Sequence, residues 1–114
     1  MPKEMKMVLL FDLYGTLLSE HQREIFDVYY NDDLSLSEIA ENFGITRQGV
    51  LNNVRTAEKK LSEFEASLGL AEKFRKNSNL AEKISVLAQD IAKGRGNARD
   101  NALKISELIS KFSI

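Results

Sequence analysis

Hydrophobic residues recur at every third or fourth position along most of the chain, which is the spacing of one buried face of an α-helix. The first stripe runs from Met7 to Leu18 and predicts a helix that contains Gly15, at a cost of about 1 kcal/mol relative to alanine. Ser19 then begins a Ser-Glu-His-Gln capping box, the start signal of a second helix. The apolar residues of this second helix are Ile25, Phe26, Tyr29 and Tyr30.

A short third helix and a long fourth helix follow. Ser35 and Glu38 form a second capping box, and Gly44 can take the positive φ with which many helices end. Thr46 is of the type that caps the start of a helix. The apolar residues of the fourth helix alternate in steps of four and three, the heptad spacing of a coiled-coil seam, and they are Val50, Val54, Ala57, Leu61, Phe64 and Leu68.

Two polar stretches divide the remainder of the chain. Residues 77–79 predict a break before an amphipathic helix, and the Gly94-Arg95-Gly96 segment predicts another break before a last helix. No stretch after Leu18 has the branched apolar run of a buried strand. We therefore expect an all-α protein.

The expected architecture is a helix-turn-helix bundle with a long third or fourth helix, followed by C-terminal helices. Its domains are predicted as a helix-turn-helix domain over residues 1–70 and a C-terminal helical extension over residues 71–114.

Composition limits the chemistry. The absence of cysteine excludes disulfides and thiolate metal sites, and a single histidine, His21, excludes a histidine cluster for a metal within one chain. We expect no cofactor and no bound metal, and His21 is interpreted as a surface residue at a helix start. The longest apolar stretch is too short to span a membrane, so a soluble cytoplasmic protein is expected.

Charge is unevenly distributed although the formal net charge is only −1. Residues 11–33 hold six acids against one arginine, whereas residues 46–61 hold four bases against one acid. Residues 71–114 hold nine bases against five acids. Such asymmetry permits a basic working face on a nearly neutral molecule.

Asp12 raises the question of catalysis, because the segment Asp12-Leu13-Tyr14-Gly15-Thr16 resembles the nucleophile motif of haloacid dehalogenase-like hydrolases. That enzyme class needs a parallel sheet, and every later apolar series has helical spacing. Tyr14 also stands where the phosphatases of that class carry a second aspartate. We therefore expect Asp12 to be a helix residue and the protein not to be an enzyme.

The segment LSEIAENFGITRQGVLNNV, residues 36–54, carries the strongest functional signal. A helix-turn-helix needs a small residue where its two helices meet, which Ala40 supplies, and a glycine at the turn, which Gly44 supplies. The second helix of such a motif enters the major groove of DNA with its N-terminal residues nearest the bases.

With Val50 and Val54 facing the core, the predicted DNA-binding residues are the outward ones. Arginine pairs with guanine, and glutamine or asparagine with adenine, while a leucine can contact a thymine methyl group. Thr46 and the free amides of the helix start can bind a phosphate. The complete set is Thr46, Arg47, Gln48, Leu51, Asn52, Arg55 and Lys59.

Two other interpretations remain open at this point. These polar residues are also what the solvated face of any surface helix carries, and helix-turn-helix units also serve as packing elements or protein-binding modules.

The heptad seam either packs inside the chain or joins two copies in a symmetric homodimer. A homodimer is expected, because a helix of this length is longer than a small core can cover.

Residues 9–70 resemble the YlxM family of small bacterial helix-turn-helix proteins. The resemblance rests on an ordered set that includes Leu17-Leu18, Gln22, Tyr29-Tyr30, Asp33, Ser35-Leu36, Glu38-Ile39-Ala40, Gly44, Arg47-Gln48, Val50, Asn53 and Glu58-Lys59. That family is similar in fold to region four of bacterial sigma factors. Two departures are Gly49, where alanine is usual, and Leu51, where an aromatic residue is usual.

Genes of the YlxM family commonly neighbour those of the signal recognition particle GTPases, which implies a role in that protein-targeting pathway. The expected function is therefore that of a DNA-binding regulatory protein acting in this pathway. The alternative is a non-enzymatic adaptor that binds the signal recognition particle GTPase or its RNA through the long helix and the basic tail from Lys93 onward.

Overall fold

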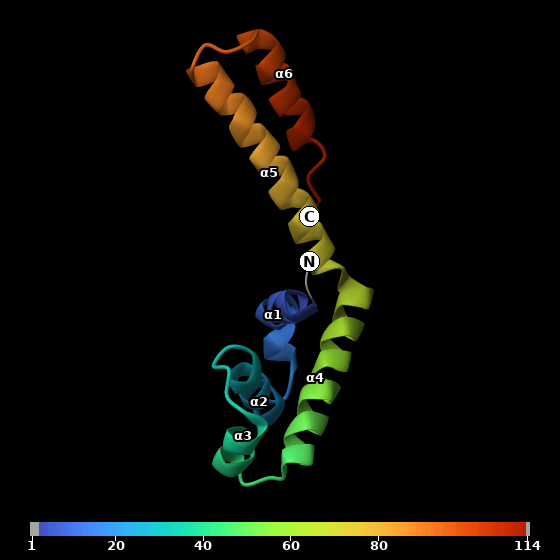
Figure 1. The fold of residues 1–114 in the computed structure, drawn as a ribbon. Helices are drawn as coiled ribbons and strands as arrows, with labels where there is room; N and C mark the ends of the chain where they lie inside the picture. The colour runs from blue at the N-terminus through green and yellow to red at the C-terminus, as the bar shows by residue number, and fades with distance from the viewer. Residues whose placement is uncertain (1–2, 114) are drawn as a thin grey trace. The chain divides into compact units, whose positions relative to one another are not determined.

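The structure is a computed structural model, and it describes residues 3–113. Over this range the chain forms α-helices, a single turn of 3-10 helix and no strand, which confirms the all-α prediction. The helices are α1 (Lys3–Tyr14), α2 (Glu20–Tyr30), α3 (Leu36–Phe43), α4 (Arg47–Leu68), α5 (Leu70–Ala92) and α6 (Ala98–Ile109), and the 3-10 turn η1 is Gly15–Leu17 (Figure 1).

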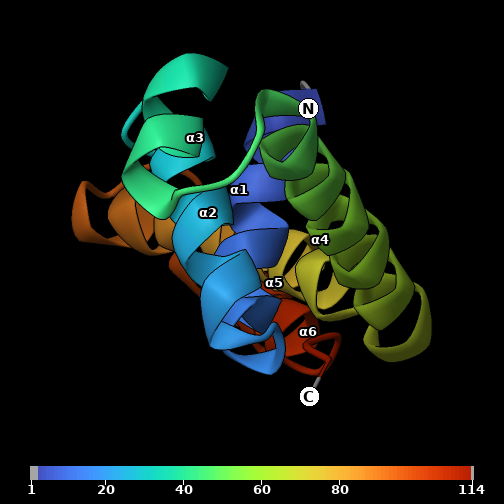
Figure 2. The same cartoon turned by 90° about the horizontal axis from the view of Figure 1, so that it is seen from below.

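The chain divides into two compact units, which we call unit 1 (Met1–Ala71) and unit 2 (Glu72–Ile114). Unit 1 contains α1 to α4, and α4 contacts each of the other three helices. Seen from below, α1 lies between α2 and α4 (Figure 2). Unit 2 is a hairpin of the two helices α5 and α6.

Two adjoining clusters of buried side chains form the core of unit 1. The first joins α1, α2 and α4 and consists of Met7, Leu10, Tyr14, Leu18, Phe26, Ala57 and Leu61. The second joins α2, α3 and α4 and consists of Ile25, Ile39, Ala40, Val50 and Val54.

The heptad seam of α4 is therefore divided between these two clusters. Its first four members, Val50, Val54, Ala57 and Leu61, are at most 2% exposed. Phe64 packs partly against the first cluster, and Leu68 is 49% exposed. Since the chain's own helices cover most of the seam, it packs inside the chain and is not the surface that would join two copies. The homodimer stays a prediction without this support.

The first predicted helix ends earlier than its hydrophobic stripe suggests. Its α-helical part stops at Tyr14, and Gly15–Leu17 continue as a 3-10 turn. Gly15 is buried, and a Cβ atom at this position would lie 3.1 Å from the ring of Phe11. Glycine thus lets the backbone pass the Phe11 ring as it leaves the helix.

The predicted break at residues 77–79 is wrong, because α5 runs through it without interruption. The Asn77 side chain donates from Nδ2 to the carbonyl oxygen of Ser113 at 2.8 Å, and its Oδ1 accepts from Ser113 N at 3.0 Å. A polar side chain occupied in this way does not compete for the hydrogen bonds of its own helix. The helix therefore continues past a polar run.

Candidate nucleic-acid interface

The turn between α3 and α4 sets the angle of the helix-turn-helix motif. Gly44 ends α3 in the left-handed conformation, with φ 66° and ψ 33°. The next amide, Ile45 N, donates to the carbonyl oxygen of Ala40 at 3.1 Å. Ala40 and Ile39 pack against Val50 in the second cluster. The small residue and the glycine predicted for the motif are thus present, and apolar contacts hold its two helices together.

The start of α4 is capped as its sequence predicts. Thr46 Oγ1 accepts from Gly49 N at 2.9 Å, so one of the free amide groups of the first turn is satisfied by this side chain. A Cβ atom on Gly49 would lie 3.1 Å from Thr46 Oγ1. Glycine at position 49 therefore leaves room for the cap.

The predicted DNA-contacting residues of α4 lie on one side of the helix. At 3.6 residues per turn, positions 47, 48, 51, 52, 55 and 59 fall within an arc of about 140°, outside the arc that carries the core residues. Arg47, Gln48, Asn52, Arg55 and Lys59 are exposed, while Leu51 is half-buried. We call these six residues the α4 strip.

Distance along the helix separates the members of the α4 strip. Lys59 lies twelve residues beyond Arg47, which corresponds to about 18 Å along the axis. The strip therefore combines a first part near the helix start, suited to base edges, with a more distant lysine. Lys60 lies outside the strip, and its Nζ donates to Gln22 Oε1 of α2 at 3.2 Å.

Two amide side chains of the strip are held by each other. Gln48 Nε2 donates to Asn52 Oδ1 at 2.9 Å. This pairing leaves Gln48 Oε1 as an acceptor and Asn52 Nδ2 as a donor. An adenine edge in the major groove offers one donor and one acceptor, which is the complementary pair.

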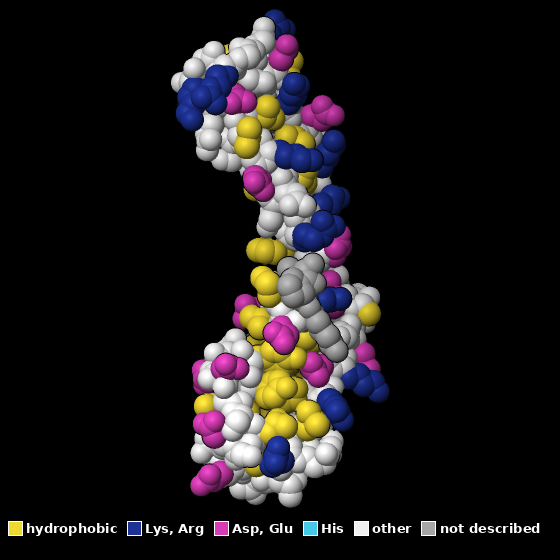
Figure 3. All heavy atoms as spheres, viewed as in Figure 1, with side chains coloured by type: hydrophobic (Ala, Val, Ile, Leu, Met, Phe, Trp, Pro, Cys, Tyr) yellow, Lys and Arg dark blue, Asp and Glu magenta, His cyan; other side chains and the backbone are white. Residues whose placement is uncertain are grey.

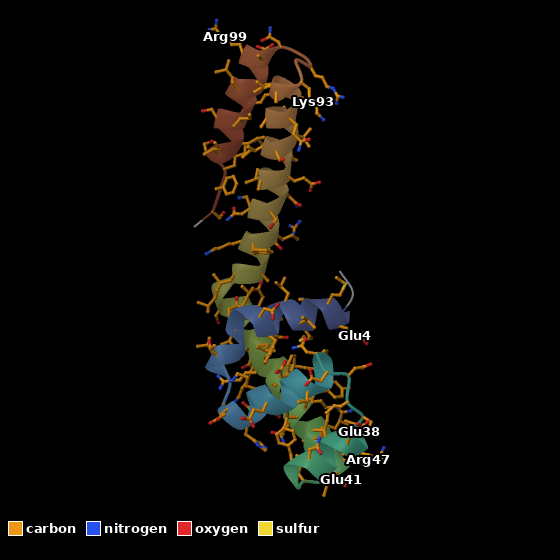
Figure 4. All side chains as sticks on the ribbon, turned by 90° about the vertical axis from the view of Figure 1, so that its left-hand side faces the viewer. Glu4, Glu38, Glu41, Arg47, Lys93 and Arg99 are labelled. Carbon is orange, nitrogen blue, oxygen red and sulfur yellow. The ribbon has the colours of Figure 1, made fainter. Side chains whose placement is uncertain are left out.

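Acidic side chains lie close to the strip. Glu38 and Glu41 of α3 are exposed, and Figure 4 shows them at the same end of unit 1 as Arg47. Glu58 falls on the same arc of α4 and accepts a hydrogen bond from the Tyr30 hydroxyl. These carboxylates reduce the positive potential that Arg47, Arg55 and Lys59 create.

Two tyrosine–glutamate pairs fix α4 against the helices before it. Tyr30 bonds to Glu58, and Tyr14 donates to Glu65 Oε1 at 2.7 Å. Burial, reinforced by the hydrogen bond to a carboxylate, raises the pKa of each phenol above its ordinary value near 10. Both tyrosines therefore stay neutral and act as hydrogen-bond donors at physiological pH. The sequence alone does not reveal these pairs, because 28 and 51 residues separate the partners.

The two remaining residues considered for chemistry, Asp12 and His21, are both exposed residues of helices. Asp12 is an exposed residue of α1, and His21 is an exposed residue in the first turn of α2 whose ring meets the Phe43 ring edge-on at 6.0 Å. Among residues 3–113, no group of three or more histidine and acidic side chains is arranged to hold a metal ion. Over the same range, no helix has both the length and the apolarity needed to cross a membrane.

Comparison with known proteins agrees with this geometry. The family described as "Putative helix-turn-helix protein, YlxM / p13 like", UPF0122, matches residues 1–98. The chain belongs to the UPF0122 family. The match covers all of unit 1 and reaches the first residue of α6, and it confirms the resemblance inferred from residues 9–70.

Similar members of the UPF0122 family occur in several bacteria. The chain is 46% identical over 91 residues to a UPF0122 protein of Shouchella clausii, which covers 79% of this chain and 84% of the relative. It is 43% identical over 106 residues to one of Thermoanaerobacter sp., which covers 92% and 88%. A third relative, from Halalkalibacterium halodurans, is 44% identical over 82 residues, or 72% and 75%.

Proposed function

We propose that this UPF0122 protein is a DNA-binding regulatory protein whose α4 strip enters the major groove. The observation that carries the proposal is the arrangement of the strip. Its polar residues are exposed on one side of a helix whose opposite side is fixed in the core and whose start is capped. Side chains on such a rigid element keep their spacing when they meet base edges.

The proposed roles follow from the chemistry of each side chain. Arg47 and Arg55 bind guanine edges or phosphates, and the Gln48–Asn52 pair reads adenine. The Leu51 side chain contacts a thymine methyl group. Thr46, with the free amides at the start of α4, and Lys59, farther along the helix, bind phosphates.

Fluorescence anisotropy of mixed-sequence duplex DNA tests this proposal. We expect the protein to bind with a salt dependence whose logarithmic slope is about −3 per chain, because three cationic side chains would each displace counterions. Arg47→Ala/Arg55→Ala should abolish binding at near-physiological salt and reduce the slope by about two. The matched control is Arg95→Ala/Arg99→Ala, which removes the same charge from unit 2.

Either of two results would refute the proposal. One is the absence of binding even at low salt. The other is equal loss of binding in both double variants, since that would mean that net charge, and not the α4 strip, governs the interaction.

A second candidate function is that of an adaptor in the signal recognition particle pathway, binding the GTPase or its RNA. It is favoured by the cluster of basic residues at the turn of the α5–α6 hairpin, where Lys93, Arg95 and Arg99 are exposed; Figure 4 labels two of them at this turn. In that case Arg95→Ala/Arg99→Ala should weaken binding to particle RNA or to the GTPase, whereas the α4 variant should not.

A further inference from the structure

Unit 2 buries very little of its apolar surface within itself. Among residues 72–113, only Leu80 and Asn101 are buried. Val86 and Leu103 are 52% and 61% exposed. A two-helix hairpin of this length lacks the interior needed for a stable core of its own. Its apolar side therefore needs a covering surface.

A groove on the hairpin is the place where such a covering surface would bind. It has a volume of about 670 Å³, and its apolar lining comes from Val86, Leu87 and Leu108. The polar and charged rim consists of Asn79, Glu82 and Lys83 of α5 and Lys104, Glu107 and Lys111 of α6. Hydrophobic side chains interspersed with charged ones are visible on unit 2 in Figure 3.

The register of the two helices can be read from both ends of the hairpin. At the open end Asn77 is hydrogen-bonded to Ser113, and at the closed end Ala92 and Ala98 bound the turn. Between these ends α5 and α6 run antiparallel with the same rise per residue, and the residues after Ile109 continue in turns whose amides bond back to the carbonyl groups of residues 106, 108 and 109. The rim residues therefore lie at matching heights, with Lys83 level with Glu107.

The same register places the other rim residues. Asn79 is level with Lys111, and Val86 is level with Lys104. Glu82 lies about one helical turn from the height of each lysine. On α6, Lys111 Nζ is 4.0 Å from Glu107 Oε1, with both side chains more than half exposed. Such an exposed pair contributes little and leaves both groups available to a partner.

We propose that the groove is filled by the hairpin of a second copy of this chain, so that two hairpins form a four-helix bundle. The two-fold axis runs parallel to the helices and places α5 of each copy on α6 of the other at equal height. Lys83 then faces Glu107 of the second copy. Glu82 lies about one turn from both Lys104 and Lys111 of the second copy.

Charge complementarity selects this arrangement over the other symmetric one. A two-fold axis perpendicular to the helices would place α6 on α6, with Lys104 of one copy facing Lys111 of the other. Like charges at an interface oppose association. The perpendicular axis would also set Glu82 beside Lys83 of the second copy, but only the parallel axis pairs opposite charges without bringing lysines together, and it covers the apolar lining of both grooves. This proposal does not depend on DNA binding, because none of its residues belongs to the α4 strip.

Sedimentation equilibrium of the full chain tests the proposal across the accessible range of protein concentration. We expect twice the mass of the 12.9 kDa chain. Val86→Glu should weaken dimerisation by at least about a hundredfold, since the symmetry places two carboxylates in the apolar interface. Ala88→Glu is the matched control, because this exposed position lies about 200° around α5 from Val86, and it should leave the dimer intact.

Disulfide trapping distinguishes the two arrangements. Because the native sequence has no cysteine, only the introduced cysteines can form disulfides. Mixing a Val86→Cys chain with a Lys104→Cys chain under mild oxidation should give the mixed dimer. A mixture of Val86→Cys with Ser106→Cys should give much less, because position 106 lies on the other side of α6 from position 104.

Three results would overturn the proposal. The first is a wild-type chain that remains monomeric at every concentration, which would mean that the groove does not bind a second copy. The second is a dimer that Val86→Glu leaves unchanged. The third is a dimer that forms without the 86–104 disulfide, which would refute the parallel arrangement.

Discussion

At the scale of single residues, the Tyr14 hydroxyl is a junction between three parts of unit 1. It donates to Glu65 of α4 and accepts from Leu70 N at 3.0 Å, the first amide of α5. Glu65 Oε1 also accepts from Ala71 N at 2.9 Å. Two amides at the start of α5 are thereby satisfied by side chains that belong to α1 and α4, in place of a conventional N-cap.

Tyrosine burial predicts a loss of stability at alkaline pH. The folded-state pKa of Tyr14 and of Tyr30 is raised, chiefly by desolvation, so above about pH 10 the unfolded chain loses these protons first. The free energy of unfolding should then fall by up to about 1.4 kcal/mol per pH unit for Tyr14. Urea unfolding from pH 8 to 11 measures it.

The control for this pH dependence is Tyr14→Phe, whose free energy of unfolding should fall less between pH 8 and pH 11. At neutral pH it should cost about 1 kcal/mol, because the Leu70 amide loses its acceptor. An unchanged alkaline slope in this variant would show that Tyr14 does not contribute.

Replacing Gly44 should destabilise the fold only through the conformation of its backbone. Its φ of 66° lies in the left-handed region, and a Cβ atom there would meet nothing within 4 Å. Gly44→Ala should therefore destabilise the fold by about 1 kcal/mol through backbone strain alone. Gly44→Asn should cost less, because asparagine tolerates this conformation. Equal losses in chemical denaturation would contradict this explanation.

At the scale of helices, the features that the sequence predicts correctly are those that depend on neighbouring residues. The capping box at Ser35–Glu38, the Gly44 turn and the Thr46 cap each involve residues within a few positions of one another, and all three are formed. At Ser19, the side chain caps α2 by accepting from Gln22 N at 3.2 Å. The Gln22 side chain, expected to complete that capping box, accepts instead from Lys60 of α4.

Features that depend on distant partners could not be predicted in this way. The run at residues 77–79 looks like a helix terminator until Ser113 is placed beside Asn77. The outward face of α4 was identified from the positions of Val50 and Val54. Its proximity to Glu38 and Glu41, and the bond from Tyr30 to Glu58, required the tertiary structure.

The division of the α4 seam leads to a prediction about stability. Leu61 is fully buried in the first cluster, so Leu61→Ala should destabilise the protein by about 2–5 kcal/mol. Leu68, at the exposed end of the same seam, should tolerate alanine within about 0.5 kcal/mol. Denaturant titrations of the two variants measure the difference. Similar losses at both positions would mean that a partner covers Leu68.

At the scale of the whole molecule, charge distribution matters more than the net charge of −1. The α4 strip is basic, while α3 beside it exposes Glu38 and Glu41. DNA binding by the strip would thus work against nearby negative charge, which selects for a close geometric match over general attraction to phosphates.

Removing the negative charges of Glu38 and Glu41 should therefore raise the affinity for DNA. Glu38→Gln/Glu41→Gln should strengthen binding of mixed-sequence DNA by roughly tenfold at low salt, with a smaller gain at near-physiological salt, where these exposed charges are screened. Anisotropy titrations at both salt concentrations measure the effect. The Glu63→Gln variant removes one exposed carboxylate sixteen residues beyond Arg47 on α4, and it should change affinity by much less than half of this effect. Unchanged affinity in the double variant would place the bound DNA away from α3.

The reciprocal bonds between Asn77 and Ser113 impose an asymmetric constraint on sequence. Asn77 presents one donor and one acceptor to the C=O and N–H groups of one residue, as a residue in a neighbouring antiparallel β-strand would. Because it recognises only main-chain atoms, position 113 should accept any residue that retains its amide hydrogen, and reject only proline. Position 77 has no such freedom, since aspartate lacks the donor and glutamine is longer by a methylene group. A single amide side chain thus holds the segment that follows α6 without specifying which side chain stands at position 113.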